Sequence, residues 1–225
     1  MEDKGFEREK ELLKNEYFSD LYFDKYQLFS LSEQINLISK YSKEFNNPRI
    51  IEVGKGNGFV SDFFKKGGYT YTTFDINKNL EPDIEGNILE FSQLIPYKAD
   101  IVVACEILEH LPLDIFEASI KEISEGSEKY AIITLPEFKK FYGFNVQIRL
   151  PKIKVFSLPL FIKYKGNKIL GSGHFWEIDY DENSKRANIE AIIKKYFSIV
   201  EKGVFHTNPY HNYYILEKDK RKEVQ

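Results

Sequence analysis

Apolar positions along the first two thirds of the chain switch repeatedly between helical and strand spacing. From residue 6 to residue 44 they recur every three or four positions, which predicts helix, until the polar segment "NNP" ends the pattern. The apolar run "RIIEV" then predicts a buried strand, and helical spacing returns in "NGFVSDFFKK" before two glycines close that helix. Alternation in "YTYTTFDI" predicts a second strand, which ends on Asp75.

The same succession of strands and helices continues through the middle of the chain. The apolar run "ADIVVACEIL" at 99–108 is followed by the amphipathic segment "LDIFEASIKEIS", and "KYAIITL" predicts another strand that stops at Pro136. Near the C-terminus, "SKRANIEAIIKKYF" has helical spacing, and "SIVEKG" and "YYILEK" are strands with no helix between them. The pattern therefore predicts an α/β fold whose mostly parallel, doubly wound sheet carries an antiparallel pair of strands at its C-terminal end.

The composition is that of a folded intracellular domain. The 225 residues fit one α/β unit, and 42% apolar with 16% aromatic residues are enough for a substantial core. The single cysteine, Cys105, excludes an internal disulfide and a cysteine-cluster zinc site. The N-terminal segment is charged rather than apolar, and no run of about 18 apolar residues occurs. We therefore expect a cytoplasmic protein without a transmembrane segment.

Charge is distributed unevenly, although the formal net charge is only −3. No acidic residue lies between Phe138 and Trp176, and aromatic residues are interleaved with basic ones there. The basic residues of this segment are Lys139, Lys140, Arg149, Lys152, Lys154, Lys163, Lys165 and Lys168. Such a segment can bind an anionic small molecule, a nucleic acid strand or a membrane surface. Alternatively, it is a lid with its aromatic rings packed inward and its lysines in solvent.

The turn after the first predicted strand reads "IEVGKGNG", with glycines at every second position behind an acidic residue. Such a turn lets the backbone approach a ligand closely and directs free N–H groups at it. The dinucleotide-binding pattern Gly-x-Gly-x-x-Gly fails because its third position is Phe59. The phosphate-binding pattern that ends in Gly-Lys-Ser/Thr fails because Lys55 precedes the last glycines. The pattern that remains is Glu52-x-Gly54-x-Gly56-x-Gly58.

This glycine pattern resembles motif I of the class I S-adenosylmethionine-dependent methyltransferases (methyltransferase type 11-like). The segment "ADIVVACEILEHLP" is similar to the family's fourth strand and the turn after it, and the resemblance covers residues 49–135. It implies a Rossmann-like class I methyltransferase sheet with N-terminal helices and a basic insertion after the fifth core strand. It also implies S-adenosylmethionine as the cofactor and S-adenosylhomocysteine as the product. A carboxylate such as Glu52 suits the ammonium group of that cofactor.

Other parts of the resemblance supply the rest of the expected cofactor site. Asp75 stands where the family's acidic residue grips both ribose hydroxyls, although a turn or helix-cap role is the alternative for it. Where the family commonly has an aspartate near the adenine, this chain has Asn87, and the adjacent Ile88 offers an apolar wall. The expected cofactor-binding residues are Glu52, Val53, Gly54, Gly56, Gly58, Asp75, Ile76, Asn87, Ile88 and Glu106.

Few residues are candidates for the chemistry itself. Methyl transfer from a sulfonium is an in-line displacement that mainly needs alignment of the nucleophile and exclusion of water. A base is needed only where the nucleophile starts protonated, and our catalytic candidates are His110, Glu106 and His174. The alternatives are a helix-capping role for His110 and an ordinary loop carboxylate for Glu106. The four histidines lack clustered spacing, so the sequence predicts no metal site.

Aromatic residues are the candidates for the substrate pocket. Trp176 lies beside His174 in "GHFWEID", and it forms either a pocket wall or a buried contact that packs the insertion. Tyr22 and Tyr26 belong to the N-terminal helices that we expect on the other side of the site. We expect one methyltransferase domain (1–225), which comprises a helical cap (1–47), a cofactor-binding core (48–135), an insertion or lid (136–176), and a C-terminal helix with two strands (177–218).

Together these observations predict an S-adenosylmethionine-dependent methyltransferase that acts on a small molecule, including anionic ones, because the basic segment is local and the whole chain is acidic. Two alternatives stay open. An RNA methyltransferase would bind polynucleotide in a salt-sensitive way through lysines of the basic segment. A module that binds S-adenosylmethionine or a partner protein without catalysis would have the same fold.

Overall fold

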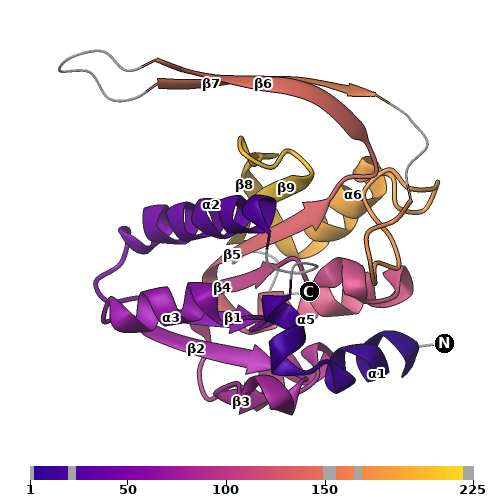
Figure 1. The fold of residues 1–225 in the computed structure, drawn as a ribbon. Coiled ribbons are helices and arrows are strands. Elements are labelled where there is room, and N and C mark those ends of the chain that lie inside the picture. Colours follow the sequence, from indigo (N-terminus) through magenta and orange to yellow (C-terminus); the bar gives the residue numbers. More distant parts are fainter. Residues whose placement is uncertain (1–2, 20–23, 149–155, 165–168, 220–225) are drawn as a thin grey trace.

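A seven-stranded sheet forms the centre of the molecule, with helices on both of its faces (Figure 1). The computed structural model describes residues 3–19, 24–148, 156–164 and 169–219. The strand order is β3-β2-β1-β4-β5-β9-β8, in which β9 runs antiparallel to both of its neighbours and the other pairs are parallel. The prediction of a mostly parallel sheet with an antiparallel C-terminal hairpin is therefore confirmed.

The strands and helices follow the predicted order along the chain. The strands of the sheet are β1 (Arg49–Val53), β2 (Thr70–Asp75), β3 (Ile84–Glu85), β4 (Ala99–Cys105), β5 (Ser127–Pro136), β8 (Phe197–Val204) and β9 (His211–Lys218). The α-helices are α1 (Asp3–Glu11), α2 (Lys25–Ser42), α3 (Phe59–Lys66), α4 (Phe91–Leu94), α5 (Phe116–Glu125) and α6 (Arg186–Tyr196). The 3-10 helices are η1 (Lys14–Phe18), η2 (Lys78–Leu80), η3 (Ile88–Glu90), η4 (Leu108–His110) and η5 (Leu113–Ile115).

Neighbouring residues of the central strands pack against opposite layers of helices. Ile50 of β1 is fully buried against a cluster that includes Ile38 of α2, whereas Ile51 is fully buried in a cluster that includes Ile120 of α5. Both faces of a parallel sheet are covered in this way, which explains why its strands read as continuous apolar runs. Burial of one such isoleucine side chain contributes about 1.5–3 kcal/mol to stability.

The N-terminal segment is not the continuous helix that its apolar spacing predicted. The helix α1 ends at Glu11, a short 3-10 helix follows, and α2 begins only at Lys25. Asp24 caps α2, because its side chain accepts a hydrogen bond from the backbone N–H of Gln27 at 2.8 Å. An aspartate at this position satisfies a helical N–H that would otherwise lack a partner, and it thereby marks a helix start. The expectation of helix is therefore wrong at residues 12–13, 19 and 24, and residues 14–18 form a 3-10 helix rather than part of a longer α-helix.

The basic insertion after β5 contains a long two-stranded hairpin, β6 (Lys140–Ile148) and β7 (Phe156–Tyr164). In Figure 1 this hairpin extends across the molecule above α2 and the β8–β9 end of the sheet. Five of the basic residues of the insertion lie outside the described residues: Arg149, Lys152, Lys154, Lys165 and Lys168. No helix in the described part of the chain is both long and apolar enough to cross a bilayer.

A buried carboxylate joins the base of this hairpin to the body of the protein. Glu137 is 2% exposed and forms ion pairs with Lys139 and Arg186 at 2.9 Å each, and with Lys163 of β7. Burial alone would raise the pKa of Glu137, but the hydrogen bonds from Lys163 and Lys139 outweigh it, so that this pKa lies below its ordinary value. Two lysines that sequence analysis placed in a basic patch are thus paired inside the protein.

We predict that Glu137→Gln lowers the free energy of unfolding at neutral pH by about 2–3 kcal/mol, because the substitution removes the charge that pairs with Lys163 and Arg186. Lys139, in contrast, keeps its ion pair with Asp179. The stabilisation by Glu137 is present above the ordinary glutamate pKa of about 4.3 and is lost as the pH falls through the lowered pKa of the folded state. Urea unfolding at neutral and acidic pH measures this difference, which should shrink in acid. The exposed carboxylate variant Glu128→Gln is the control, and an equal loss in both variants would contradict the prediction.

Candidate functional site

A cavity of about 580 Å³ opens at the carboxyl ends of β1, β2 and β4. Its lining also includes side chains of α1 and α2 and of two loops, at 171–174 and 208–211. In open α/β sheets, ligands bind at this end of the strands, and pockets for small molecules have volumes of roughly 300–1,000 Å³. The position and size of the cavity therefore identify it as the candidate site.

The glycine loop between β1 and α3 forms one wall of this cavity. Gly54, Gly56 and Gly58 all have left-handed backbones, with φ angles of 85°, 52° and 74°. A Cβ atom on Gly54 would lie 3.0 Å from Cδ1 of Ile107, whereas a Cβ atom on Gly56 would meet nothing within 4 Å. Glycine is thus required at position 54 both by its left-handed φ angle and by the close approach of Ile107. The second glycine, Gly56, lines the cavity and has open space where a Cβ atom would lie.

Glu52 lies on β1 beneath the glycine loop and is only 6% exposed. Its Oε2 atom has no hydrogen-bond partner among the described residues. Burial is the main reason why the pKa of Glu52 rises to about 8, and the nearby charge of Asp75 adds to the effect. Interaction with the side chain of Tyr71 opposes the rise, but one oxygen of this buried carboxyl group stays unpaired, so the position favours a cationic ligand group beside it.

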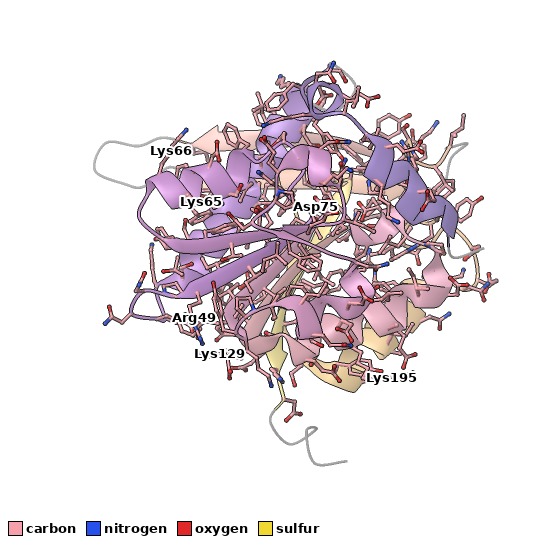
Figure 2. All side chains as sticks on the ribbon, turned by 90° about the horizontal axis from the view of Figure 1, so that it is seen from below. Arg49, Lys65, Lys66, Asp75, Lys129 and Lys195 are labelled. Atoms are coloured by element: carbon pink, nitrogen blue, oxygen red, sulfur yellow. The ribbon has the colours of Figure 1, made fainter. Side chains whose placement is uncertain are left out.

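Asp75 ends β2, the strand beside β1, and lines the same cavity. Its carboxylate accepts hydrogen bonds from the backbone N–H groups of Lys55 at 2.7 Å and Asn77 at 2.8 Å. Burial raises the pKa of Asp75, and these backbone hydrogen bonds oppose the rise. The two oxygens of a carboxylate suit two neighbouring hydroxyl groups of a ligand. Figure 2 shows Asp75 toward the middle of the molecule, while the labelled lysines lie toward its rim.

Most of the other expected cofactor-binding residues also line the cavity, with two exceptions. Val53, Gly54, Gly56, Ile76, Ile88 and Glu106 are among the lining residues. Gly58 instead caps the N-terminus of α3. The side chain of Asn87 caps η3, where it accepts a hydrogen bond from the backbone N–H of Leu89 at 3.0 Å. The structure therefore places Ile88, rather than Asn87, on the cavity wall.

Glu106 connects the end of β4 to α2. Its carboxylate accepts hydrogen bonds from the side-chain amides of Gln27 at 2.9 Å and Gln34 at 2.8 Å. Nδ1 of His211 lies 3.6 Å from the same carboxylate. The backbone of Glu106 has a φ of 57°, which is unusual for a residue other than glycine and is typical of functional sites.

The other two catalytic candidates come together with Glu109. The rings of His110 and His174 lie perpendicular, with their centroids 4.9 Å apart, and one ligand atom from each of the three residues lies within 4.8 Å of the others. Glu109 is 1% exposed, and neither of its carboxylate oxygens has a hydrogen-bond partner in the described part of the chain. Burial raises the pKa of Glu109 well above its ordinary value, and burial lowers the pKa of His110 to about 3.

Backbone contacts explain why a residue at position 174 reaches the turn after β4. The backbone N–H of Phe175 donates to the carbonyl of Glu109 at 2.8 Å, and the indole N–H of Trp176 donates to the carbonyl of Leu111 at 3.1 Å. The indole ring also packs edge-on against Phe116 of α5. Trp176 is 2% exposed within the core and is not a lining residue, so its position matches the packing alternative rather than a pocket wall.

The N-terminal side of the cavity contains one of the two expected tyrosines. Tyr26 lines the cavity, although it is 59% exposed, and Tyr22 lies outside the described residues. Several lining residues had no role in the sequence analysis: Glu9, Gln27, Gln34, Glu109, Tyr210 and His211. A sequence signal existed for Glu109, which stands three residues after Glu106 in "CEILEHLP". The others belong to segments whose packing against the sheet is not visible in local spacing.

The cavity lining is acidic. Its carboxylates are Glu9, Asp24, Glu52, Asp75, Glu106 and Glu109. Lys55 also lines the cavity, but its ammonium group is engaged in a hydrogen bond of 2.6 Å to the backbone carbonyl of Glu81. Burial raises the pKa of Glu9, Glu52, Asp75 and Glu109, so these carboxyl groups ionise most readily beside a cationic ligand, and they disfavour an anionic one.

Comparisons with known proteins identify the fold. No protein-family model matches the sequence, and no curated protein matches it. Among solved structures, magnesium protoporphyrin IX methyltransferase from Synechocystis PCC 6803, with bound S-adenosylmethionine, aligns with a TM-score of 0.57 and 15% identity over 97% of this chain and 93% of that chain.

Two further solved structures have similar alignments. A glycopeptide N-methyltransferase aligns with a TM-score of 0.55 and 8% identity over 84% of this chain and 90% of that chain. An S-adenosylmethionine-dependent methyltransferase from Clostridium acetobutylicum ATCC 824 aligns with a TM-score of 0.52 and 11% identity over 84% of this chain and 92% of that chain. At such low identity the likeness is one of fold, and the predicted Rossmann-like methyltransferase fold is confirmed.

Proposed function

We propose that this protein is an S-adenosylmethionine-dependent methyltransferase that acts on a small molecule. The observation that carries the proposal is the position of two buried carboxylates, Glu52 and Asp75, on adjacent parallel strands beside a loop of left-handed glycines. Both carboxylates line one cavity at the carboxyl end of the sheet. The solved structures of similar fold include methyltransferases with bound S-adenosylmethionine or S-adenosylhomocysteine, which supports the same cofactor here.

The chemistry of the cofactor fits this half of the cavity. In our proposal Glu52 binds the ammonium group of the cofactor, and the backbone at Gly54 and Gly56 lies against its amino-acid part. Asp75 accepts hydrogen bonds from the two ribose hydroxyls. Ile88 packs against the adenine ring as an apolar wall. The reactive methyl group would then face the other half of the cavity, where α1, α2 and the two loops contribute side chains.

The acidic lining favours a neutral or cationic acceptor over an anionic one. Of the described lysines of the basic segment, Lys139 and Lys163 are paired with Glu137 and Lys140 is exposed, and none of the three lines the cavity. The aromatic residue Phe141 of β6 does line it. The same pairing weakens the argument for RNA, because lysines with internal partners are less available to phosphates. We therefore propose a small acceptor that bears an amine or a hydroxyl group.

The transfer itself would be an in-line displacement. The acceptor atom forms a bond to the methyl carbon while the bond from that carbon to sulfur breaks, and the bonding electrons stay on sulfur to give S-adenosylhomocysteine. Because burial lowers the pKa of His110 to about 3, this imidazole is neutral at physiological pH and is a weak base. Our proposal therefore assigns Glu106, His110 and His174 to binding and orienting the acceptor, and an acceptor proton leaves to solvent.

We predict that Gly56→Ala weakens the binding of S-adenosylhomocysteine at least about tenfold, which corresponds to about 1.4 kcal/mol, because the new methyl group would enter the space of the cofactor. Isothermal titration calorimetry measures the effect. Gly68→Ala is the matched control, since Gly68 also has a left-handed φ, 82°, with nothing within 4 Å of an added Cβ atom, and it does not line the cavity. Both variants should lose about 1–2 kcal/mol of stability through backbone strain. Equal affinity in the two variants would contradict the proposed cofactor position.

A second prediction concerns the dependence of cofactor affinity on pH. With a pKa of about 8, Glu52 keeps its proton at neutral pH in the unliganded protein, and an ammonium group beside it favours the ionised form. Binding should therefore release a proton, and the affinity for S-adenosylhomocysteine should rise by up to about tenfold per pH unit from about pH 6 to about pH 7.5. Calorimetry in buffers with different heats of ionisation counts the released protons. Glu52→Gln should abolish this release, and a wild-type affinity independent of pH would refute the role of Glu52.

A further inference from the structure

We propose that Glu109, His110 and His174 bind one divalent transition-metal ion in the wall of the cavity. One ligand atom from each residue lies within 4.8 Å of the others, which is close enough for small side-chain shifts to bring the three donors around one ion. Glu109 and His110 belong to the turn after β4, and His174 is delivered by the loop that returns from the insertion. The proposal goes beyond methyl transfer, since it concerns metal affinity and does not depend on the identity of the cofactor.

Glu109 supplies the strongest evidence for an ion. Its side chain is almost completely buried, and both of its carboxylate oxygens lack a hydrogen-bond partner in the described part of the chain. Native proteins rarely leave buried polar atoms unpaired, and such an atom calls for an explanation. A coordinated dication would pair both the charge and the lone pairs of this carboxylate.

His110, another member of the cluster, also has an unsatisfied ring nitrogen. Its Nδ1 atom is buried and has no hydrogen-bond partner in the described residues, although Oε1 of Glu9 lies 3.6 Å away. A metal ligand must be a neutral imidazole with a free lone pair, and this buried ring is suited to that state. The charge of Arg8 also acts on His110 and on Glu9, so the case for a cation rests on the unpaired carboxylate of Glu109 rather than on the charges around the cluster.

His174 is oriented in the way that histidine ligands of metals usually are. Its Nδ1 atom lies 3.2 Å from Oε1 of Glu177, so its Nε2 atom is the one available to a metal. Glu177 is itself fully buried, and the same oxygen accepts hydrogen bonds from the hydroxyl of Tyr210 at 2.6 Å and the backbone N–H of Gly171 at 2.7 Å. A carboxylate that holds the second ring nitrogen fixes the tautomer and the direction of a metal-binding histidine.

The donor set indicates the class of metal. Two imidazole nitrogens and one carboxylate oxygen suit Zn²⁺, Mn²⁺, Fe²⁺ or Co²⁺, whereas Mg²⁺ and Ca²⁺ prefer oxygen ligands. Three protein ligands leave further coordination positions open, and all three residues line the cavity. An acceptor oxygen that occupied one of these positions would be oriented by the ion, and its hydroxyl pKa would be lowered.

The test is a titration of the untagged, chelator-treated full chain with Co²⁺, followed by calorimetry and by the visible absorption of the bound ion. We expect one ion per chain, with Mg²⁺ binding at least about tenfold more weakly than Co²⁺. Glu109→Gln and His174→Ala should each weaken Co²⁺ binding by more than about a hundredfold, and the positioning variant Glu177→Gln should weaken it by about 10–100-fold. The absorption spectrum should change in Glu177→Gln, since a reoriented imidazole alters the coordination.

Matched controls separate this site from incidental metal binding. His206→Ala and Glu182→Gln change an exposed histidine and an exposed carboxylate elsewhere on the chain, and both variants should bind Co²⁺ like the wild type. Glu109→Gln keeps the shape of the side chain and removes a buried charge, so it should fold, as circular dichroism can verify. The proposal is overturned if folded wild-type protein does not bind Co²⁺, or if binding survives Glu109→Gln. Failure of S-adenosylhomocysteine to bind would leave the metal result unaffected, because the titration contains no cofactor.

Discussion

Carboxylates buried at the carboxyl ends of the parallel strands, with little basic charge beside them, are the constraint on which this site depends. Glu52, Asp75 and Glu109 are each less than a tenth exposed, and burial raises the pKa of each. Ionised groups in such surroundings are unfavourable until a cation or a hydrogen-bond donor joins them. The apolar layers on both faces of the sheet provide the stability that tolerates this cost. The unfavourable charge is thus held ready for ligands that bring positive charge with them.

The parallel sheet gathers these groups from distant parts of the sequence. Consecutive strands end at the same edge, so that positions 52, 75 and 106–110 meet although they are far apart along the chain. A different rule applies at the base of the β6–β7 hairpin, where Glu137 is as buried as the site carboxylates but is surrounded by basic partners. The buried charge of Glu137 attaches the hairpin to the body of the protein, because its basic partners belong to the protein itself. Glu52, Asp75 and Glu109 form no such pair among the described residues, so in the cavity a ligand has to supply the positive charge.

The sequence was sufficient to predict the sheet and most residues on the glycine-loop side of the cavity. Apolar runs are local signals, and they predicted the mostly parallel sheet with its antiparallel C-terminal pair. The resemblance to class I methyltransferases implied that Glu52 and Asp75 belong to the cofactor site, and both line the cavity. The break between α1 and α2 was missed because apolar spacing continues across it, while the cap at Asp24 depends on one hydrogen bond. The cluster around Glu109 was missed for another reason. It is created by backbone contacts between the turn after β4 and a loop more than sixty residues later, which no spacing of histidines could indicate.

The two walls of the cavity are built from different elements, and substitutions in them should therefore differ in their effect on folding. One wall consists of turns that end the core strands, where a substitution would disturb the sheet itself. The opposite wall includes α2, which is joined to β4 through neutral amide groups that donate to Glu106. Gln27 and Gln34 are constrained by these hydrogen bonds, whereas Tyr26 lines the cavity and is 59% exposed, so it can be replaced while the strands and their buried layers stay constant. Chains of this fold can therefore keep the same strands and core and differ at exposed residues of the cavity wall. New ligand preferences can then arise with little loss of folding stability.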